Sequence, residues 1–269
     1  MPTERLAVLV VGGAGFIGSH LVLALQSAGY QPVVLDNLST GHRDAVLTAD
    51  CIIGELADAA LLQALFTRYQ FVAVMHCAAL IEVGESMRQP LAFYQNNVCA
   101  TLVLLKTMLA HGVKQFIFSS TAAVYGEPQS LPVSEQHPIH PVNPYGRSKV
   151  MVEEIVKDLA KSDGLRFAIL RYFNAAGADP EGRLGERHEP ESHLIPIALQ
   201  VASGQRSALT IYGDDYPTPD GTCIRDYIHV ADLGTTHVLA LQALLNGGDS
   251  LLCNVGTGCG VRNRRVKYP

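Results

Sequence analysis

Apolar segments alternate with mixed polar and apolar segments along the first two thirds of the chain, a pattern typical of parallel strands separated by helices. Six short apolar runs predict strands that are buried on both faces of a sheet. These runs cover residues 6–11, 31–35, 51–53, 71–75, 115–119 and 166–171. Helices are predicted between them at residues 19–28, 58–69, 90–111 and 149–156. The order of these elements predicts an α/β fold with a parallel, doubly wound sheet.

The pattern changes beyond Gly177. Residues 178–191 are polar and rich in glycine, proline and acids, a composition typical of a surface loop or lid. The later elements are predicted to be a helix at 193–203, a strand at 209–212, a strand and helix within 228–246, and a last strand at 251–255. We therefore expect a larger domain over residues 1–176 and a smaller lobe over residues 177–269, with segments that return to the sheet.

Composition limits the possible functions. With 269 residues and 48% hydrophobic content, the chain can bury one large core, or one core and a smaller lobe. A net charge of −5 with only 20 Lys+Arg argues against a nucleic-acid surface. No apolar run reaches transmembrane length, and the first residues lack the hydrophobic region of a signal peptide.

The cysteines and histidines do not predict a metal site. The six cysteines form no Cys-x-x-Cys pair, and no His/Cys cluster has zinc spacing, so we expect reduced cysteines in a cytoplasmic protein. Five histidines are expected to be structural or on the surface, without companions at metal spacing: His20, His42, His111, His188 and His237.

A glycine-rich turn follows the first predicted strand. Residues 12–18 fit Gly-x-Gly-x-x-Gly from Gly13 and Gly-x-x-Gly-x-x-Gly from Gly12. Such glycines allow a tight turn and close approach to a pyrophosphate, which the N–H groups at the start of the next helix can bind. The second strand ends on Asp36, about twenty residues further on, where an acid can bind both ribose hydroxyls and repel a 2′-phosphate. These features predict NAD rather than NADP.

A tyrosine and a lysine four residues apart follow a proline-rich loop. Tyr145 and Lys149 share one face of the predicted helix. An ammonium beside a phenol favours the phenolate, which would make Tyr145 a general base, although on spacing alone two surface side chains are the alternative. The fifth strand leads to Thr121 at the same sheet edge, where its hydroxyl could bond the reacting oxygen of a substrate. Together the three residues favour a catalytic role.

Other polar positions keep two interpretations. Asn96 can face a cofactor or the solvent. Arg225 can clamp a diphosphate or join Asp226 in a surface network. The small residues after the fourth strand, including Ala78, leave room for a flat ligand that crosses the sheet edge.

Assembled, these motifs resemble the extended short-chain dehydrogenase/reductase superfamily, and within it the UDP-glucose 4-epimerase family. The resemblance covers roughly residues 5–258, and the Arg-Asp-Tyr-Ile-His-Val segment from Arg225 is fairly specific to this group. The segments that carry it are residues 12–20, 36–38, 83–86, 96–98, 118–126, 144–149, 171–174 and 222–230.

This resemblance implies a Rossmann-type NAD-binding domain at residues 1–176, a substrate-binding lobe at 177–269, and a homodimer without membrane or nucleic-acid partners. It implies that Tyr145 takes the proton of the sugar 4-hydroxyl while hydride passes from C4 to NAD. The 4-keto sugar then turns over and takes the hydride back on its other face, so that UDP-galactose and UDP-glucose interconvert. Thr121 would orient the hydroxyl, and Lys149 would lower the tyrosine pKa and hold the nicotinamide ribose.

The resemblance also implies two sets of binding residues. Those at NAD-binding positions are Gly12, Gly15, Phe16, Ile17, Gly18, Asp36, Asn37, Glu55, Leu56, Ala78, Asn96, Tyr145, Lys149 and Phe173. Those at positions that bind the UDP-sugar are Thr121, Tyr145, Asn174, Leu194, Tyr212 and Arg225.

The sequence departs from the family at three places. Ile81 stands where some relatives have a lysine for the cofactor phosphates, and Glu55 replaces a shorter aspartate. The basic tail after Gly258 does not resemble the expected helix, so the lobe is expected to be incomplete, with a truncated or frame-shifted end.

Three other functions are alternatives to this one. A 4,6-dehydratase needs an acid/base pair directly after the hydroxyl residue, where Ala122 and Ala123 stand, so this activity is disfavoured. A 4-epimerase of an N-acetylated or uronic UDP-sugar, and a catalytically impaired NAD-binding remnant, remain open.

Overall fold

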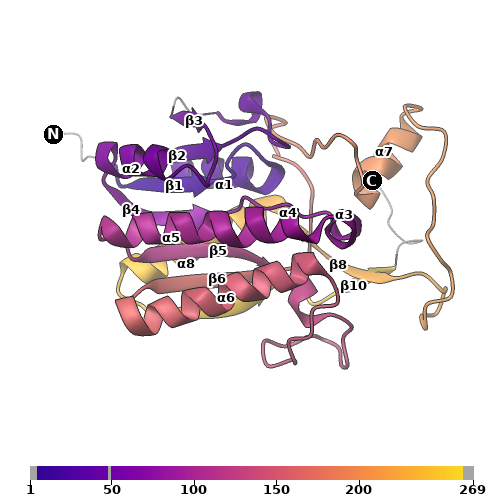
Figure 1. Cartoon of the computed structure of the whole chain (residues 1–269). Coiled ribbons are helices and arrows are strands. Elements are labelled where there is room, and N and C mark those ends of the chain that lie inside the picture. The colour runs from indigo at the N-terminus through magenta and orange to yellow at the C-terminus, as the bar shows by residue number, and fades with distance from the viewer. Residues whose placement is uncertain (1–4, 48–49, 263–269) are drawn as a thin grey trace.

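The computed structural model describes residues 5–47 and 50–262. Seven parallel strands form the central sheet (Figure 1). In spatial order they are β3 (Cys51–Ile53), β2 (Gln31–Asp36), β1 (Ala7–Val11), β4 (Phe71–His76), β5 (Gln115–Thr121), β6 (Arg166–Tyr172) and β9 (Leu251–Val255). The strand order reverses between β1 and β4, which is the point where ligands bind in open parallel sheets.

Helices cover both faces of this sheet. One core lies under α2 (Ala59–Arg68), α5 (Ala100–Ala110) and α6 (Pro144–Asp163). The other core lies under α1 (Phe16–Ser27) and α8 (Val230–Leu245). All five residues of β1 are buried because both faces of that strand are covered, which explains its continuous apolar sequence. The predicted α/β doubly wound fold is confirmed.

The helix predicted over residues 90–111 contains a wider turn. It consists of α4 (Pro90–Tyr94), a π-helical turn (Gln95–Cys99) and α5. Within the π turn, Asn97 is buried, and its side chain bonds the backbone N–H and C=O of Leu80 at 2.9 and 3.0 Å and the Ser148 hydroxyl at 3.0 Å. Such single π turns occur often at functional sites. Here the turn ties the loop after β4 to α6.

Four short helical elements complete this part of the chain. Three of them were not predicted: the 3₁₀ helices η1 (Arg43–Ala45) and η3 (Ala122–Tyr125), and the helix α3 (Val83–Arg88). The fourth, α7 (Leu194–Ala202), matches the helix predicted at 193–203.

A second, three-stranded sheet lies beyond the carboxyl edge of the first. It contains β7 (Asn174–Ala176), β8 (Ile224–His229) and β10 (Gly260–Arg262), in the order β10-β8-β7. β8 begins four residues before the predicted strand, so Arg225 lies within it. The strand predicted at 209–212 is wrong, because these residues form an exposed loop in which Tyr212 is 87% exposed. A four-residue strand that is exposed on both faces would bury too little apolar surface to be stable.

Two expectations about the chain's organisation stay predictions. The boundary after residue 176 coincides with the end of β7, but α8 and β9 return to the large sheet from beyond it. Most of the basic tail, residues 263–269, lies outside the described residues. Among the described helices, none has the length and hydrophobicity needed to cross a bilayer.

Candidate active site

A cavity of about 420 Å³ opens at the carboxyl ends of the parallel strands, beside the reversal between β1 and β4. Its volume lies in the range of small-molecule sites. Every residue that the resemblance assigned to NAD lines this cavity, and so do Thr121 and Asn174. Most of them come from the turn before α1, the first turn of α1 and the ends of β2 to β6, because parallel strands all end at one edge. Asn96 comes from the π turn, and Tyr145 and Lys149 come from α6.

The glycine turn is shaped for close approach. Gly12 has a φ of +82°, and a Cβ there would lie 2.5 Å from the backbone nitrogen of Ala78. A Cβ on Gly18 would lie 2.0 Å from the carbonyl oxygen of Gly12, so the helix packs directly on the turn. A Cβ on Gly15, by contrast, would have only the carbonyl oxygen of Gly12 within 4 Å, at an ordinary contact distance of 3.6 Å. An open surface at Gly15 leaves room for a phosphate.

The helix α1 starts at Phe16, three residues earlier than predicted. Its first turn contains no acidic side chain, and Gly15 makes no side-chain cap, so the free N–H groups and the positive end of the helix dipole face the cavity. This arrangement fits the pyrophosphate of a dinucleotide.

Asp36 is held in place at the end of β2. One carboxylate oxygen accepts the N–H of Ala14 at 2.9 Å, and the other accepts the N–H of Leu38 at 2.8 Å. Each oxygen keeps further lone-pair capacity for a ligand hydroxyl. Beside it, the Asn37 amide donates to both carboxylate oxygens of Glu55 at 3.1 and 3.2 Å. A paired set of polar groups thus lines the adenosine end expected for NAD.

Tyr145 lies in the first turn of α6. Asn143 caps this helix by accepting the N–H of Gly146 at 2.8 Å, and Pro144 occupies its first position, as prolines often do. A Cβ on Gly146 would lie 2.8 Å from the carbonyl oxygen of Ala123, so α6 approaches η3 closely. This close approach places Tyr145 beside Thr121, whose hydroxyl favours the phenolate.

Burial, and not Lys149, dominates the pKa of Tyr145 in this structure. Burial raises the pKa of Tyr145 to about 12, and only the hydrogen bond with Thr121 opposes this shift. Lys149 is itself buried, and its ammonium donates to the carbonyl oxygen of Ser119 at 2.8 Å. The same ammonium lies 6.0 Å from the centroid of the Tyr145 ring. Burial lowers the pKa of Lys149 to about 8. Spacing predicted that the two side chains are neighbours, but not that burial disfavours both charges.

A buried polar network beneath these residues was missed. Glu153 and Arg171 form an ion pair with side chains 1% and 3% exposed, and Glu153 also accepts the Ser120 hydroxyl at 2.6 Å. Arg171 donates to the Tyr125 hydroxyl at 2.9 Å. The position of Glu153, four residues after Lys149 on the same helix face, was the signal that could have revealed it.

The proposed substrate residues are not all brought together. Asn174 lines the cavity, and its amide donates to the carbonyl oxygen of Asp226 at 2.8 Å. Leu194, Tyr212 and Arg225 do not line the cavity: Leu194 begins α7, Tyr212 lies in the exposed loop, and the exposed Arg225 donates to the carbonyl oxygen of Ile224.

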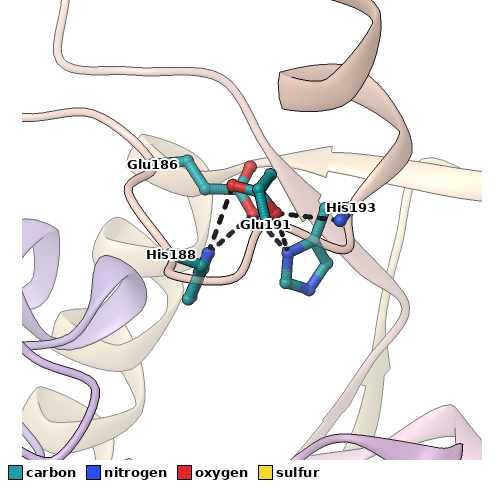
Figure 2. Close-up of side chains that lie close together, drawn as sticks. All are labelled: Glu186, His188, Glu191 and His193. Carbon is teal, nitrogen blue, oxygen red and sulfur yellow. Dashed lines mark hydrogen bonds and ion pairs between the residues drawn. The ribbon is translucent and has the colours of Figure 1, made fainter. Parts of the chain in front are cut away.

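A group of titratable side chains also reaches the cavity. Glu186, His188 and His193 line it and lie close to Glu191 (Figure 2). The expectation that His188 has no companions is therefore wrong. Its companions are all local, in the order Glu-x-His-x-x-Glu-x-His, so the signal was present in the sequence.

Comparisons with known proteins agree with this geometry. The NAD dependent epimerase/dehydratase family matches residues 8–256. A UDP-glucose 4-epimerase of Rhizobium meliloti is 54% identical over 253 residues, which is 94% of this chain and 77% of that protein. One of Halalkalibacterium halodurans is 52% identical over 261 residues, or 97% of this chain and 78% of that protein. The crystal structure of UDP-glucose 4-epimerase from Brucella ovis in complex with NAD has a TM-score of 0.94 and 51% identity, covering 97% and 80% of the two chains.

Proposed function

The chain belongs to the NAD dependent epimerase/dehydratase family, and from this premise we propose that it interconverts UDP-galactose and UDP-glucose with NAD as cofactor. The observation that carries the proposal is that Thr121 and Tyr145, which interact with each other, both line the cavity that also contains the glycine turn and Asp36. The alanines at 122 and 123 leave no acid/base pair for a dehydratase.

The chain's own residues move one proton. NAD, when bound, supplies a reversible two-electron oxidation at C4 of the sugar. Tyr145 takes the proton of the sugar 4-hydroxyl and later returns it, and Thr121 holds both oxygens in line through its hydroxyl. Because burial raises the tyrosine pKa, the phenol needs a nearby positive charge to act near neutral pH, and Lys149 is the cation that this site provides.

The binding residues take complementary parts in the proposal. The start of α1 holds the pyrophosphate, Asp36 accepts the adenosine ribose hydroxyls, and Lys149 holds the other ribose. Asn174 binds the UDP-sugar at the far end of the cavity. Leu194, Tyr212 and Arg225 would have to approach when the substrate binds, since the loop between α7 and β8 is exposed.

The wider assignments are also part of the proposal. We assign the cofactor to residues 1–176 and the sugar to residues 177–269, in a cytoplasmic enzyme of galactose metabolism. A homodimer is supported by exposed apolar side chains on neighbouring helices: Met87 on α3, Leu91 on α4, Leu102 on α5 and Met151 on α6 are between 44% and 81% exposed. Light scattering of Leu91→Glu should then show a monomer where the unchanged chain is a dimer.

Proton NMR of UDP-galactose with the purified chain and NAD tests the reaction directly. We expect UDP-glucose anomeric signals to grow, and Tyr145→Phe to slow this growth by roughly 10²- to 10⁴-fold while NAD still binds. Tyr30→Phe, in the core away from the cavity, is the matched control and should keep full activity. An unchanged spectrum from a folded, NAD-bound chain would reject the proposal, and parallel runs with UDP-N-acetylglucosamine would then test the alternative sugar.

A further inference from the structure

Four titratable side chains converge in the segment that leads into α7 (Figure 2). Glu186, His188, Glu191 and His193 each offer one ligand atom, and these atoms all lie within 4.8 Å of one another. We propose that this cluster, the Glu₂His₂ site, binds a divalent transition-metal ion of the zinc class through two imidazole nitrogens and two carboxylate oxygens. The site is separate from the proton transfer at Tyr145 and does not depend on the proposed reaction.

The distances suit tetrahedral coordination. His193 Nδ1 lies 2.9 Å from a Glu191 oxygen and 3.0 Å from a Glu186 oxygen. His188 Nδ1 lies 3.5 Å from the same Glu186 oxygen and 3.7 Å from the other Glu191 oxygen. Zinc bonds of about 2.0–2.2 Å place tetrahedral ligands roughly 3.3–3.6 Å apart. These four distances bracket this value, and the wider separations in the cluster, up to 4.8 Å, would have to shorten as the side chains close on the ion.

Burial makes the cluster costly without an ion. The side chains of Glu186 and Glu191 are 8% and 5% exposed, so two carboxylates share a poorly hydrated space. Within the described part of the chain, His188 Nδ1 is buried and makes no hydrogen bond. A cation between these groups would neutralise the carboxylates and use the free imidazole lone pair.

The ligand types select the metal. Mg²⁺ and Ca²⁺ prefer shells made of oxygen, whereas imidazole nitrogen favours zinc and its transition-metal neighbours. Three of the four residues line the cavity, which provides a path for the ion from solvent.

An ion here would fix the loop beside the cavity. His193 is the residue that precedes the first turn of α7, so the ion would join this helix to the loop that carries Glu186. The same loop is tied to the large domain, because Arg187 pairs with Asp44 and its carbonyl oxygen lies 3.3 Å from the His42 ring. Metal binding would therefore hold the cavity wall between the two parts of the chain.

Titration of the metal-free chain with Co²⁺, followed by competition with Zn²⁺, tests the site. We expect one equivalent of Co²⁺ to give the intense visible bands of a tetrahedral ion, Zn²⁺ to displace it, and Mg²⁺ to leave the spectrum unchanged. No near-ultraviolet thiolate band should appear, since the site contains no cysteine. Octahedral bands, a thiolate band or no bands would overturn the proposal.

Variants assign the ligands. His193→Asn and Glu191→Gln should each weaken Co²⁺ and Zn²⁺ binding by more than about 10-fold. His140→Asn, an exposed histidine outside the cluster, is the matched control and should bind as the unchanged chain does. Binding that survives in the double variant His188→Asn/His193→Asn would refute the assignment. X-ray absorption of the zinc-loaded unchanged chain gives an answer even if a variant fails to fold: two imidazoles and two oxygens support the site, and sulfur or an oxygen-only shell rejects it.

Discussion

The ion pair of Glu153 and Arg171 anchors the helix that carries Tyr145 and Lys149. Arg171 donates from Nε to a Glu153 oxygen at 2.9 Å, and its Nη2 donates to the other oxygen. Both side chains are almost fully buried, and α6 meets β5 and β6 through them. Replacement of Glu153 by glutamine keeps the size of the side chain but removes its charge. Arg171 would then be a buried cation without a counter-charge.

The expected loss of stability is large. Breaking a buried pair by removing one charge costs about 3–5 kcal/mol, because the remaining ion is poorly solvated. For a domain of this size the melting temperature should fall by roughly 6–20 °C. The double variant Glu153→Met/Arg171→Met removes both charges, and Tyr125 keeps its hydrogen bond to Asn254 at 2.6 Å. Only the Ser120 hydroxyl loses its acceptor, at a cost of about 1–3 kcal/mol.

Chemical denaturation of the single and double variants measures these terms as a double-mutant cycle. We expect the double variant to be more stable than Glu153→Gln and than Arg171→Met. Glu154→Gln, at the next position in the chain, is the matched control. The Glu154 side chain is 62% exposed and pairs with Lys157 on the surface, so this change should cost less than about 1 kcal/mol. If the double variant loses the sum of the two single losses, the pair is not coupled and the reasoning is refuted.

Three further predictions concern the cavity. Asp36→Ala should weaken NAD binding and reduce the discrimination against NADP, and an unchanged preference in fluorescence titrations would contradict the ribose role. Gly18→Ala would place a Cβ 2.0 Å from the Gly12 oxygen, so calorimetry should show a large loss of both NAD affinity and stability. Because the raised pKa of Tyr145 is about 12, its phenol should stay neutral from pH 7 to 10, and the tyrosinate absorbance over this range should be equal in the cofactor-free chain and in Tyr145→Phe. A larger absorbance in the unchanged chain would show that burial does not control this group.

Much of the cavity could be predicted because its residues follow strands. The glycine turn comes directly after β1, Asp36 ends β2 and Thr121 ends β5. Parallel strands end at one edge, so each of these positions could be placed from local pattern alone. Leu194 begins α7, Arg225 lies in β8, and the loop between these two elements contains Tyr212. There no periodic pattern fixes the direction of a side chain, and their predicted meeting could not be derived from chain order.

The Glu₂His₂ cluster was not predicted, although its residues lie close together in the sequence. Its four residues lie within eight positions, but they belong to a loop, where the spacing of a helix or strand gives no guide to which side chains meet. The spacing of histidines and cysteines alone does not reveal the cluster. Carboxylates also bind zinc, and including Glu186 and Glu191 would have revealed the pattern.

The pKa of Tyr145 shows what spacing leaves out. Helix geometry correctly made Tyr145 and Lys149 neighbours, and in water an ammonium beside a phenol would favour the phenolate. Inside this fold both groups are buried, so each charged form loses hydration before it can stabilise the other. The lysine also directs its ammonium to the Ser119 carbonyl. A positive charge at Lys149 and a negative charge at Tyr145 would therefore stabilise each other, and the phenolate would be most populated while Lys149 is protonated.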